Sequence, residues 1–431
     1  MGTDRFAVLC LDVSVPVFVA QGKKDTFDLG ASMTGTELAK GIYAVGCVDW
    51  SVRDFHSFEI QKGASYNAYL LQDEKTAVID TVKAPFADAF LRNIREKTDL
   101  AKVDYIVCNH LEPDHAGALA AVVKAIPSAA VVCNPKFRSE VNGYFDTGGW
   151  NFHVLQPGET LSLGSRSLTF LNTPMVHWPE SMVTYCPEEK ILFSNDAFGQ
   201  HIASSFLFDD QGDLDEILSE AKDYYANIVT PYGRQVLRTL DAAVGLDIQM
   251  IAPSHGFVWR RNLSAILDAY RAWASGSYAA KAVVLYDSMW ESTAKMAEEI
   301  VRGAREKTDK VDVVLLHVRR NPLSRIAKEM LDAPCAAIGS ATLNTQMMPR
   351  MAAVLNYVKG LKFREKSSFA FGSSGWGPGG PEGVAKWLEE VKYPVLTEPV
   401  KAVFRPTADV LAKCRAAGAV MAETALSKAE I

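Results

Sequence analysis

The stretch that decides the fold is residues 109–119, Asn-His-Leu-Glu-Pro-Asp-His-Ala-Gly-Ala-Leu. It follows an apolar run, Tyr105 to Cys108, and it contains four potential metal ligands: His110, Glu112, Asp114 and His115. Isolated histidines and carboxylates are usually surface residues or hydrogen-bonded core residues. Two imidazoles and two carboxylates crowded at the end of a strand need a cation to compensate them. The stretch therefore predicts a metal site on a loop that follows a strand.

Three further strand-like runs lead to a candidate ligand. They are Leu168 to Thr173 before His177, Ile191 to Ser194 before Asp196, and Ile248 to Ala252 before His255. Ligands at strand ends are typical of a site built on loops at one edge of a sheet, because the sheet fixes the base of each loop. Four imidazoles and three carboxylates suit two metals, and a carboxylate such as Asp196 can bridge two cations. The carboxylate content favours iron over zinc.

Length and composition indicate two large domains. The 431 residues are about three times the length of an ordinary single domain. A net charge of -6 gives no reason to expect a nucleic-acid or anionic-membrane partner. The cysteines form no Cys-x-x-Cys pair, which argues against a disulfide framework, an iron–sulfur cluster or an attached rubredoxin-like domain. No run approaches the roughly 20 apolar residues of a membrane span, and we expect a reducing cytoplasm.

The pattern along the chain divides it into four parts. Residues 1–36 form an N-terminal extension to which no role is assigned, and residues 37–273 form a first domain of β-rich runs and helical stretches. Residues 274–280 begin with Ala-Ser-Gly-Ser and are predicted to be a linker. Residues 281–431 alternate strand, loop and helix, which predicts a parallel sheet with helices on both faces and ligand loops at the carboxyl ends of its strands.

Three loops of the second domain are suited to hold a ligand. The first places three hydroxyls before a helix, which favours a phosphate, although helix capping alone is the alternative for Ser292 and Thr293. The other two supply small residues for close backbone approach, and Trp376 can stack on a ring. The candidate contacts are Ser288, Met289, Trp290, Ser292, Thr293, Ser340, Ala341, Thr342, Asn344, Ser373, Ser374, Gly375, Trp376 and Gly377.

The motifs resemble those of the flavodiiron proteins from about residue 37 to the C-terminus. The resemblance rests on His-x-Glu-x-Asp-His at residues 110–115, Met-Val-His-Trp-Pro around His177, Ser-Asn-Asp-Ala-Phe-Gly around Asp196 and Ser-His-Gly around His255. It implies an α/β chain with an N-terminal metallo-β-lactamase-like αββα sandwich domain. A flavodoxin-like domain with a doubly wound parallel sheet follows, and it binds FMN through the three loops.

The resemblance also implies roles for individual residues. His110, Glu112 and His177 would hold one iron, Asp114, His115 and His255 the other, and Asp196 would lie between them. In some family members the equivalent of His115 stands off the metal. His201 is either a proton donor in the substrate pocket or a packing residue. His56, Tyr224 and Tyr225 either line the iron pocket or pack against apolar side chains.

By the same resemblance, the expected reaction is the reduction of dioxygen to water, of nitric oxide to nitrous oxide, or of both. Reduced FMN and two ferrous ions together store the four electrons that dioxygen requires. The resemblance implies a head-to-tail homodimer or a dimer of dimers. It also implies an external electron donor, either rubredoxin or a deazaflavin such as reduced coenzyme F420. The first ligand shell does not decide between the two gases, and we expect a preference for oxygen.

Two other classes of protein are weighed against this interpretation. A two-zinc hydrolase with an appended flavodoxin domain is the main alternative, and Glu112 argues against it because hydrolytic zinc sites are richer in histidine. A non-catalytic electron carrier would explain the loops of the second domain but not seven metal ligands at strand ends.

Overall fold

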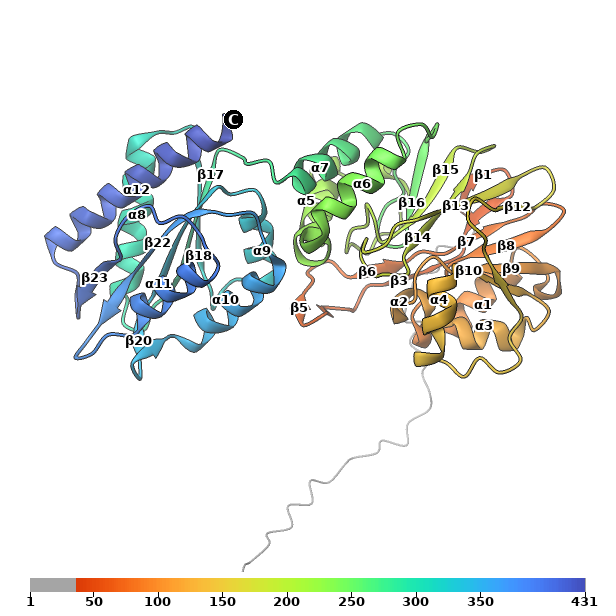
Figure 1. The fold of residues 1–431 in the computed structure, drawn as a ribbon, viewed down its shortest axis with the longest axis horizontal. Helices are drawn as coiled ribbons and strands as arrows, with labels where there is room; N and C mark the ends of the chain where they lie inside the picture. Colours follow the sequence, from red (N-terminus) through yellow and green to blue (C-terminus); the bar gives the residue numbers. More distant parts are fainter. Residues whose placement is uncertain (1–35, 431) are drawn as a thin grey trace, which may run out of the picture.

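The computed structural model describes residues 36–430, so the predicted extension lies outside the described residues apart from its last position (Figure 1). Two β-sheets form the centre of the first part of the chain. The larger has the spatial order β1 (Glu37–Ala39), β2 (Ile42–Ala44), β7 (Tyr69–Leu71), β8 (Thr76–Ile79), β9 (Val103–Val107), β10 (Ala130–Cys133) and β11 (Phe152–Val154). The smaller has the order β12 (Thr160–Ser162), β13 (Ser167–Asn172), β14 (Met182–Cys186), β15 (Ile191–Asn195) and β16 (Met250–Pro253).

Helices cover the outer faces of these two sheets (Figure 1). Beside the larger sheet lie α1 (Ala87–Arg95), α2 (Pro113–Ala116), α3 (Leu119–Ala125) and α4 (Pro135–Glu140). Beside the smaller lie α5 (Leu214–Tyr224), α6 (Gly233–Ala242) and α7 (Leu263–Ser275). Apolar side chains fill the space between the sheets, where the rings of Tyr69 and Phe193 lie 5.1 Å apart. The result is the αββα sandwich that the sequence predicts.

Short elements complete this part. Two small sheets pair β3 (Cys47–Asp49) with β6 (Ala64–Tyr66) and β4 (Asp54–Phe55) with β5 (Phe58–Glu59). A π-helical turn, η5 (Tyr225–Val229), continues α5. The 3₁₀ turns are η1 (Ala84–Phe86), η2 (Leu100–Lys102), η3 (Val141–Gly143), η4 (Asp209–Gln211) and η6 (Thr230–Tyr232). Among these short elements, the β4–β5 hairpin and η5 are bonded to the second part of the chain through Glu59 and Asn227.

The second part is a doubly wound parallel sheet. Its spatial order is β18 (Asp312–His317), β17 (Lys281–Asp287), β19 (Cys335–Ser340), β22 (Ser367–Ser374) and β23 (Val400–Val403), with every pair parallel. One face carries α8 (Ser292–Lys307) and α12 (Ala408–Ala429). The other carries α9 (Leu323–Leu331), α10 (Pro349–Leu361) and α11 (Gly380–Glu390). A small hairpin, β20 (Thr342–Leu343) with β21 (Gln346–Met347), follows β19.

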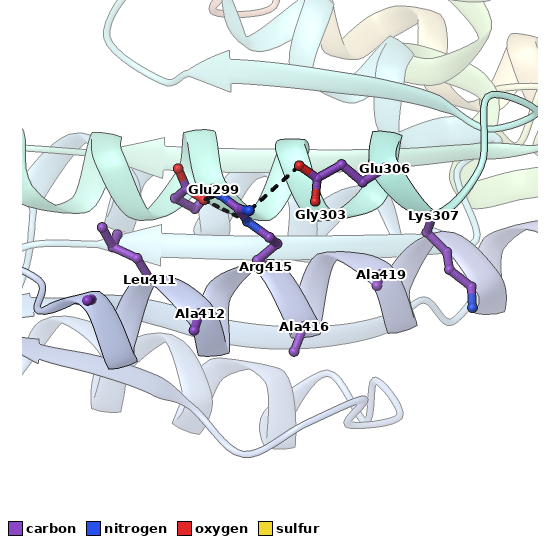
Figure 2. Close-up of a pocket in the computed structure, with 10 residues that line it drawn as sticks. Glu299, Gly303, Glu306, Lys307, Leu411, Ala412, Arg415, Ala416 and Ala419 are labelled. Atoms are coloured by element: carbon purple, nitrogen blue, oxygen red, sulfur yellow. Dashed lines mark hydrogen bonds and ion pairs between the residues drawn. The ribbon is translucent and has the colours of Figure 1, made fainter.

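Helices α8 and α12 pack at backbone contact. A Cβ at Gly303 would lie 1.9 Å from the carbonyl oxygen of Arg415, so only glycine fits there. Along the same contact the guanidinium of Arg415 lies 2.7 Å from Glu299 and 3.7 Å from Glu306, beside a surface groove (Figure 2). Together the two helices pack on one face of the sheet.

Two details differ from the sequence-based expectation. Helix α7 runs to Ser275 and is capped by Gly276 in the left-handed conformation, so the first two residues of the predicted linker are helical. Residues 113–116 form helix α2 rather than a loop, because Pro113 at its first turn has the backbone angle that a helix start requires. Within the described range, no helix has the length and apolar character needed to span a membrane.

Candidate functional site

The predicted metal ligands converge at one edge of the two sheets. His110 and Glu112 follow β9, and Asp114 and His115 lie in α2 immediately after them. His177 follows β13, Asp196 follows β15 and His255 follows β16. All seven side chains are buried, with Glu112 the most exposed at 6%. The structure therefore brings together residues that are up to 145 positions apart in the sequence, from His110 to His255.

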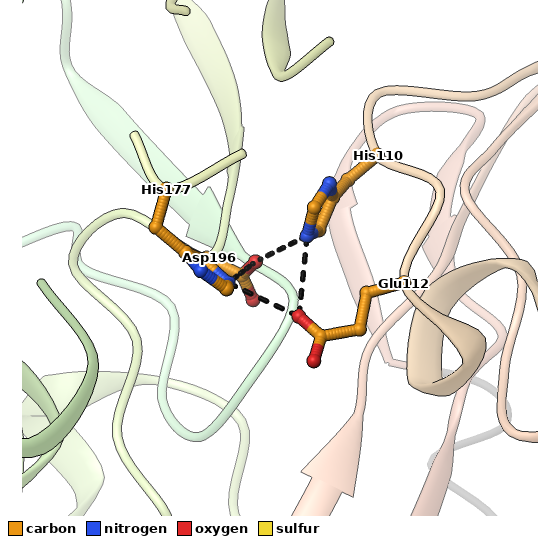
Figure 3. Close-up of side chains that lie close together, drawn as sticks. All are labelled: His110, Glu112, His177 and Asp196. Atoms are coloured by element: carbon orange, nitrogen blue, oxygen red, sulfur yellow. Dashed lines mark hydrogen bonds and ion pairs between the residues drawn. The ribbon is translucent and has the colours of Figure 1, made fainter. Parts of the chain in front are cut away.

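The first cluster contains His110, Glu112, His177 and Asp196 (Figure 3). Nε2 of His177 lies 3.1 Å from Oε2 of Glu112 and 3.2 Å from Oδ2 of Asp196. Nε2 of His110 lies 3.2 Å from the same Glu112 oxygen and 3.4 Å from the same Asp196 oxygen. The ligand atoms of this group all lie within 4.8 Å of one another, which is the spacing of donors around one ion.

The second cluster contains Asp114, His115 and His255. Nε2 of His255 lies 3.2 Å from Oδ2 of Asp114, and Nε2 of His115 lies 3.3 Å from Oδ1 of Asp114. Oδ1 of Asp196 lies 2.8 Å from Nε2 of His115 and 3.4 Å from Nε2 of His255. Asp196 thus presents one carboxylate oxygen to each cluster.

The donor set fits two cations. Several buried atoms in it lack a hydrogen-bond partner of acceptable geometry: both carboxylate oxygens of Asp114, Oδ2 of Asp196, and Nε2 of His115 and His255. Buried polar atoms are normally hydrogen-bonded, and unpartnered ones of this kind suit an ion. Imidazole and carboxylate together match the ligand preferences of non-haem iron.

The electrostatics of the cluster also favour positive charge. Burial opposes the charged imidazole of His177, but contacts with Asp196 and Glu112 outweigh it and raise its pKa to about 9. Burial likewise opposes the charged form of His255, yet Asp114 and Asp196 raise its pKa to about 10. The carboxylates thus create a field that attracts protons, and divalent cations would be attracted by the same field.

Two contacts orient the histidines and were not predicted. Nδ1 of His110 lies 2.7 Å from Oε1 of Glu180, and Nδ1 of His255 lies 2.7 Å from the carbonyl oxygen of Ser65. An acceptor on Nδ1 leaves Nε2 free to face the cluster, as metal-binding histidines require. The only local sequence signal for Glu180 is its position three residues after His177.

Four further residues were predicted to lie around the metal site: His56, His201, Tyr224 and Tyr225. Two of them bond to a candidate ligand. The hydroxyl of Tyr224 donates to Oδ1 of Asp196 at 2.8 Å, and Nε2 of His56 lies 2.5 Å from Oε1 of Glu112. His201 is buried, and its ring centroid lies 5.3 Å from that of His255. Burial, and next the charge of His255, lower the pKa of His201 well below its usual value. Tyr225 instead packs on Tyr270 and Trp273, so apolar packing is its observed role.

The three predicted ligand loops of the second part lie side by side. They follow β17, β19 and β22, which are adjacent parallel strands, so their carboxyl ends share one edge. The first region comprises Ser288, Met289 and Trp290, with Ser292 and Thr293 at the start of α8. The second comprises Ser340 at the end of β19 with Ala341, Thr342 and Asn344, and the third comprises Ser373 and Ser374 at the end of β22 with Gly375, Trp376 and Gly377. Oγ1 of Thr293 and Oγ of Ser373 lie 3.1 Å apart, which joins the first loop to the third.

The loops differ in what they offer a ligand. Glu291 is the N-cap residue of α8 and its side chain makes no cap bond, whereas Ser292 and Thr293 lie inside the helix. This speaks against the capping alternative and leaves main-chain N–H groups for an anion. The hydroxyls of Ser340 and Thr342 accept bonds from Met348 and Gly380, so they shape the second loop. Trp290 and Trp376 are 85% and 96% exposed, as stacking platforms for a flat ring would be.

Comparison with known proteins agrees with both halves of this site. A family model described as "ODP family beta lactamase" matches residues 64–256, and one described as "Flavodoxin" matches residues 284–418. The nitric oxide reductase of Moorella thermoacetica is 41% identical over 382 residues, which is 88% of this chain and 95% of that protein. The chain belongs to the flavodiiron protein family.

Solved structures extend the agreement to the whole fold. Rubredoxin oxygen:oxidoreductase from Desulfovibrio gigas has a TM-score of 0.87 and 36% identity, over 91% of this chain and 99% of that one. The flavodiiron protein from Giardia intestinalis has a TM-score of 0.87 and 35% identity, over 92% and 97% of the two chains. This flavodiiron protein is therefore an oxidoreductase, and the alternative of a two-zinc hydrolase is not supported.

Proposed function

We propose that this flavodiiron protein reduces dioxygen to water and nitric oxide to nitrous oxide, with two irons and FMN as its cofactors. The observation that carries the proposal is the position of Asp196, which contacts both histidine clusters through different oxygens. A carboxylate so placed suits a bridge between two metals rather than two separate sites. In such a centre the irons would supply two open positions and two electrons to a small gaseous substrate.

The protein side chains would hold and orient this centre. His110, Glu112 and His177 would ligate one iron, and Asp114, His115 and His255 the other. Tyr224 would fix Asp196 through its hydroxyl, and Tyr224 and His201 would border the substrate pocket as proton-handling groups. The burial of all seven ligands would keep bulk water out, which favours complete reduction of the substrate over leakage of partly reduced oxygen.

The three loops of the second part would bind FMN. The first loop and the start of α8 would hold the phosphate, and Trp290 and Trp376 would flank the ring. The flavin would collect electrons from an external donor and pass them to the irons. The proposal includes a head-to-tail homodimer or a dimer of dimers, as the resemblance implies, in which the flavin of one chain would lie beside the irons of its partner.

We propose that both gases are substrates and that the protein is cytoplasmic. The relatives support both substrates, because one is named nitric oxide reductase and another rubredoxin oxygen:oxidoreductase. The second name also supports rubredoxin as the donor, with a reduced deazaflavin as the second candidate. The sequence-based expectation that oxygen is preferred stays part of the proposal.

A side-by-side assay tests it. The iron-loaded, FMN-containing protein is reduced without air and supplied with reduced rubredoxin, and consumption of each gas is followed with the same preparation. Loss of oxygen without peroxide, or loss of nitric oxide with one nitrous oxide formed per two molecules consumed, is the expected result. Consumption of neither gas by protein with full iron and flavin content would refute the proposal.

A further inference from the structure

Two side chains of the second part bond to segments of the first part that contact the candidate metal ligands. One is Ser324, the second residue of α9, which is 2% exposed. Its hydroxyl donates to the carbonyl oxygen of Glu59 at 2.7 Å, and its carbonyl oxygen accepts from Nδ2 of Asn227 at 3.3 Å. Glu59 and Asn227 belong to two separate segments of the first part. Each segment also carries a side chain that contacts a predicted metal ligand.

The first segment is the β4–β5 hairpin. Glu59 is its last residue, and a two-residue turn of positive φ at His56 and Ser57 joins its strands. Such a turn is short and stiff, so fixing one strand fixes the position of the tip. Nε2 of His56 at that tip lies 2.5 Å from Oε1 of Glu112. The hairpin therefore connects α9 to the first cluster in a few residues, at the junction of the two parts (Figure 1).

The second segment is the end of α5 and the π-helical turn η5. Tyr224 donates to Asp196 from the end of α5, and Asn227 lies three residues later in η5. The amide of Asn227 also bonds back to Asp223, and its Oδ1 accepts from the hydroxyl of Tyr357 in α10 at 2.7 Å. Irregular turns of this kind re-aim side chains inside helices and are frequent at functional sites.

We propose that Ser324 and Tyr357 are positioning residues for the metal centre. Together they hold the hairpin and η5 at one place, and so fix where His56 meets Glu112 and where Tyr224 meets Asp196. Neither residue touches a predicted ligand. The inference rests on the proposed function for the assignment of Glu112 and Asp196 as iron ligands, and it adds that the flavodoxin-like part shapes the centre of its own chain.

The test uses Ser324→Ala, Tyr357→Phe and the double variant in the iron-loaded holoprotein. Tyr357→Phe keeps the ring and its packing, so it remains informative if Ser324→Ala does not fold. The matched controls are Ser368→Ala and Tyr278→Phe, which remove hydroxyls that donate to the backbone carbonyls of Lys366 and Glu365 in the flavodoxin-like part. FMN per chain and melting temperature are measured for every variant, together with kcat and KM for oxygen and the electron paramagnetic resonance spectrum of the half-reduced irons.

The expected result is a changed iron spectrum and a turnover that falls about fivefold per lost bond, with FMN content and KM for the electron donor unchanged. The controls keep the wild-type spectrum. A purely structural role would lower the melting temperature without moving the spectrum, and that outcome overturns the inference. Wild-type protein that binds no iron pair would overturn the proposed function as well, whereas normal wild-type protein with unaltered variants overturns the inference alone.

A double-mutant cycle gives a second, independent readout. Tyr224→Phe removes the hydroxyl on Asp196, and Tyr357→Phe removes the hydroxyl on Asn227. If Tyr357 acts through the α5–η5 segment, the combined loss of turnover is smaller than the product of the two single losses. Losses that multiply would show that the two hydroxyls act independently, and would overturn the link through this segment.

Discussion

The Nδ1 atom of His110 lies 2.7 Å from Oε1 of Glu180, and both side chains are fully buried. Oε1 also accepts the main-chain N–H of Leu111 at 3.0 Å, so one carboxylate fixes the ring of His110 and the backbone beside it. Burial opposes the charged form of Glu180, but the contacts with His110 and Leu111 outweigh it and lower its pKa. This pair sets the direction in which His110 presents Nε2 to the first cluster.

Replacing Glu180 by glutamine is expected to weaken metal binding about 10- to 100-fold, because the acceptor that orients a ligating histidine loses its negative charge. Competition with a chelator measures the change. Glu159→Gln is the matched control, since Glu159 pairs with His153 at 2.6 Å at the protein surface, away from the cluster. Equal metal affinity in the two variants would contradict the role assigned to Glu180.

The shared position of Asp196 leads to a prediction about both metals at once. Asp196→Ala is expected to reduce the metal content below two per chain and to abolish turnover, because each cluster loses an anionic ligand. Elemental analysis and gas consumption measure the two effects. Tyr224→Phe provides the comparison, since it removes only the hydroxyl bond to Asp196 and should keep both metals. Two metals per chain and wild-type turnover in Asp196→Ala would rule out a bridging role.

The guanidinium of Arg319 holds the start of the first loop proposed to bind FMN. Nε of Arg319 lies 2.8 Å from Oδ1 of the buried Asp287, and its guanidinium also donates to the carbonyl oxygen of Ser288. We expect Arg319→Ala to weaken FMN binding about tenfold, because a charge-assisted contact that holds the proposed phosphate loop is lost. Fluorescence titration with FMN and riboflavin measures it, and riboflavin affinity should be unchanged. Arg320→Ala is the neighbouring control, and equal losses for both flavins would count against a phosphate-loop effect.

Asp223, beside Asn227 at the junction of the two parts, should make stability depend on pH. Burial raises the pKa of Asp223 to about 7, because the effect of burial is larger than the opposing effect of the Lys328 charge. The folded protein then binds a proton that the unfolded chain releases near pH 4, so Asp223 lowers stability as the pH rises from about 4 to about 7. Asp223→Asn removes this loss.

Melting curves at pH 5 and pH 8 test the assignment of Asp223. The melting temperature of Asp223→Asn relative to wild type should be higher at pH 8 than at pH 5. The matched control is Asp241→Asn, which makes the same substitution at an exposed aspartate paired with Arg271. A pH-independent difference for Asp223→Asn would show that its carboxyl does not titrate in this range.

The sequence picked out the candidate metal ligands that the structure brings together, because each follows an apolar run. Strand ends on one edge of a sheet lie close together in space even where long loops separate them in the sequence. The three candidate FMN loops were picked out for the same reason, and their assignment stays a prediction. What it could not locate depends on contacts without local pattern: Glu180 reaches His110 across 70 positions, and Ser324 reaches Glu59 across 265. Tyr224 and Tyr225 are neighbours of identical type, and only the fold of the helix shows that one faces Asp196 and the other faces Trp273.

The order of the ligands along the chain bears on how the protein is made. His110 and Glu112 leave the ribosome more than a hundred residues before His255, and the second sheet is completed only when β16 pairs with β15. Until then, a nascent chain exposes an incomplete donor set of carboxylates and imidazoles. Iron delivered before His255 has emerged would meet only part of its ligands, so the complete centre can form only once the whole sandwich domain has been synthesised.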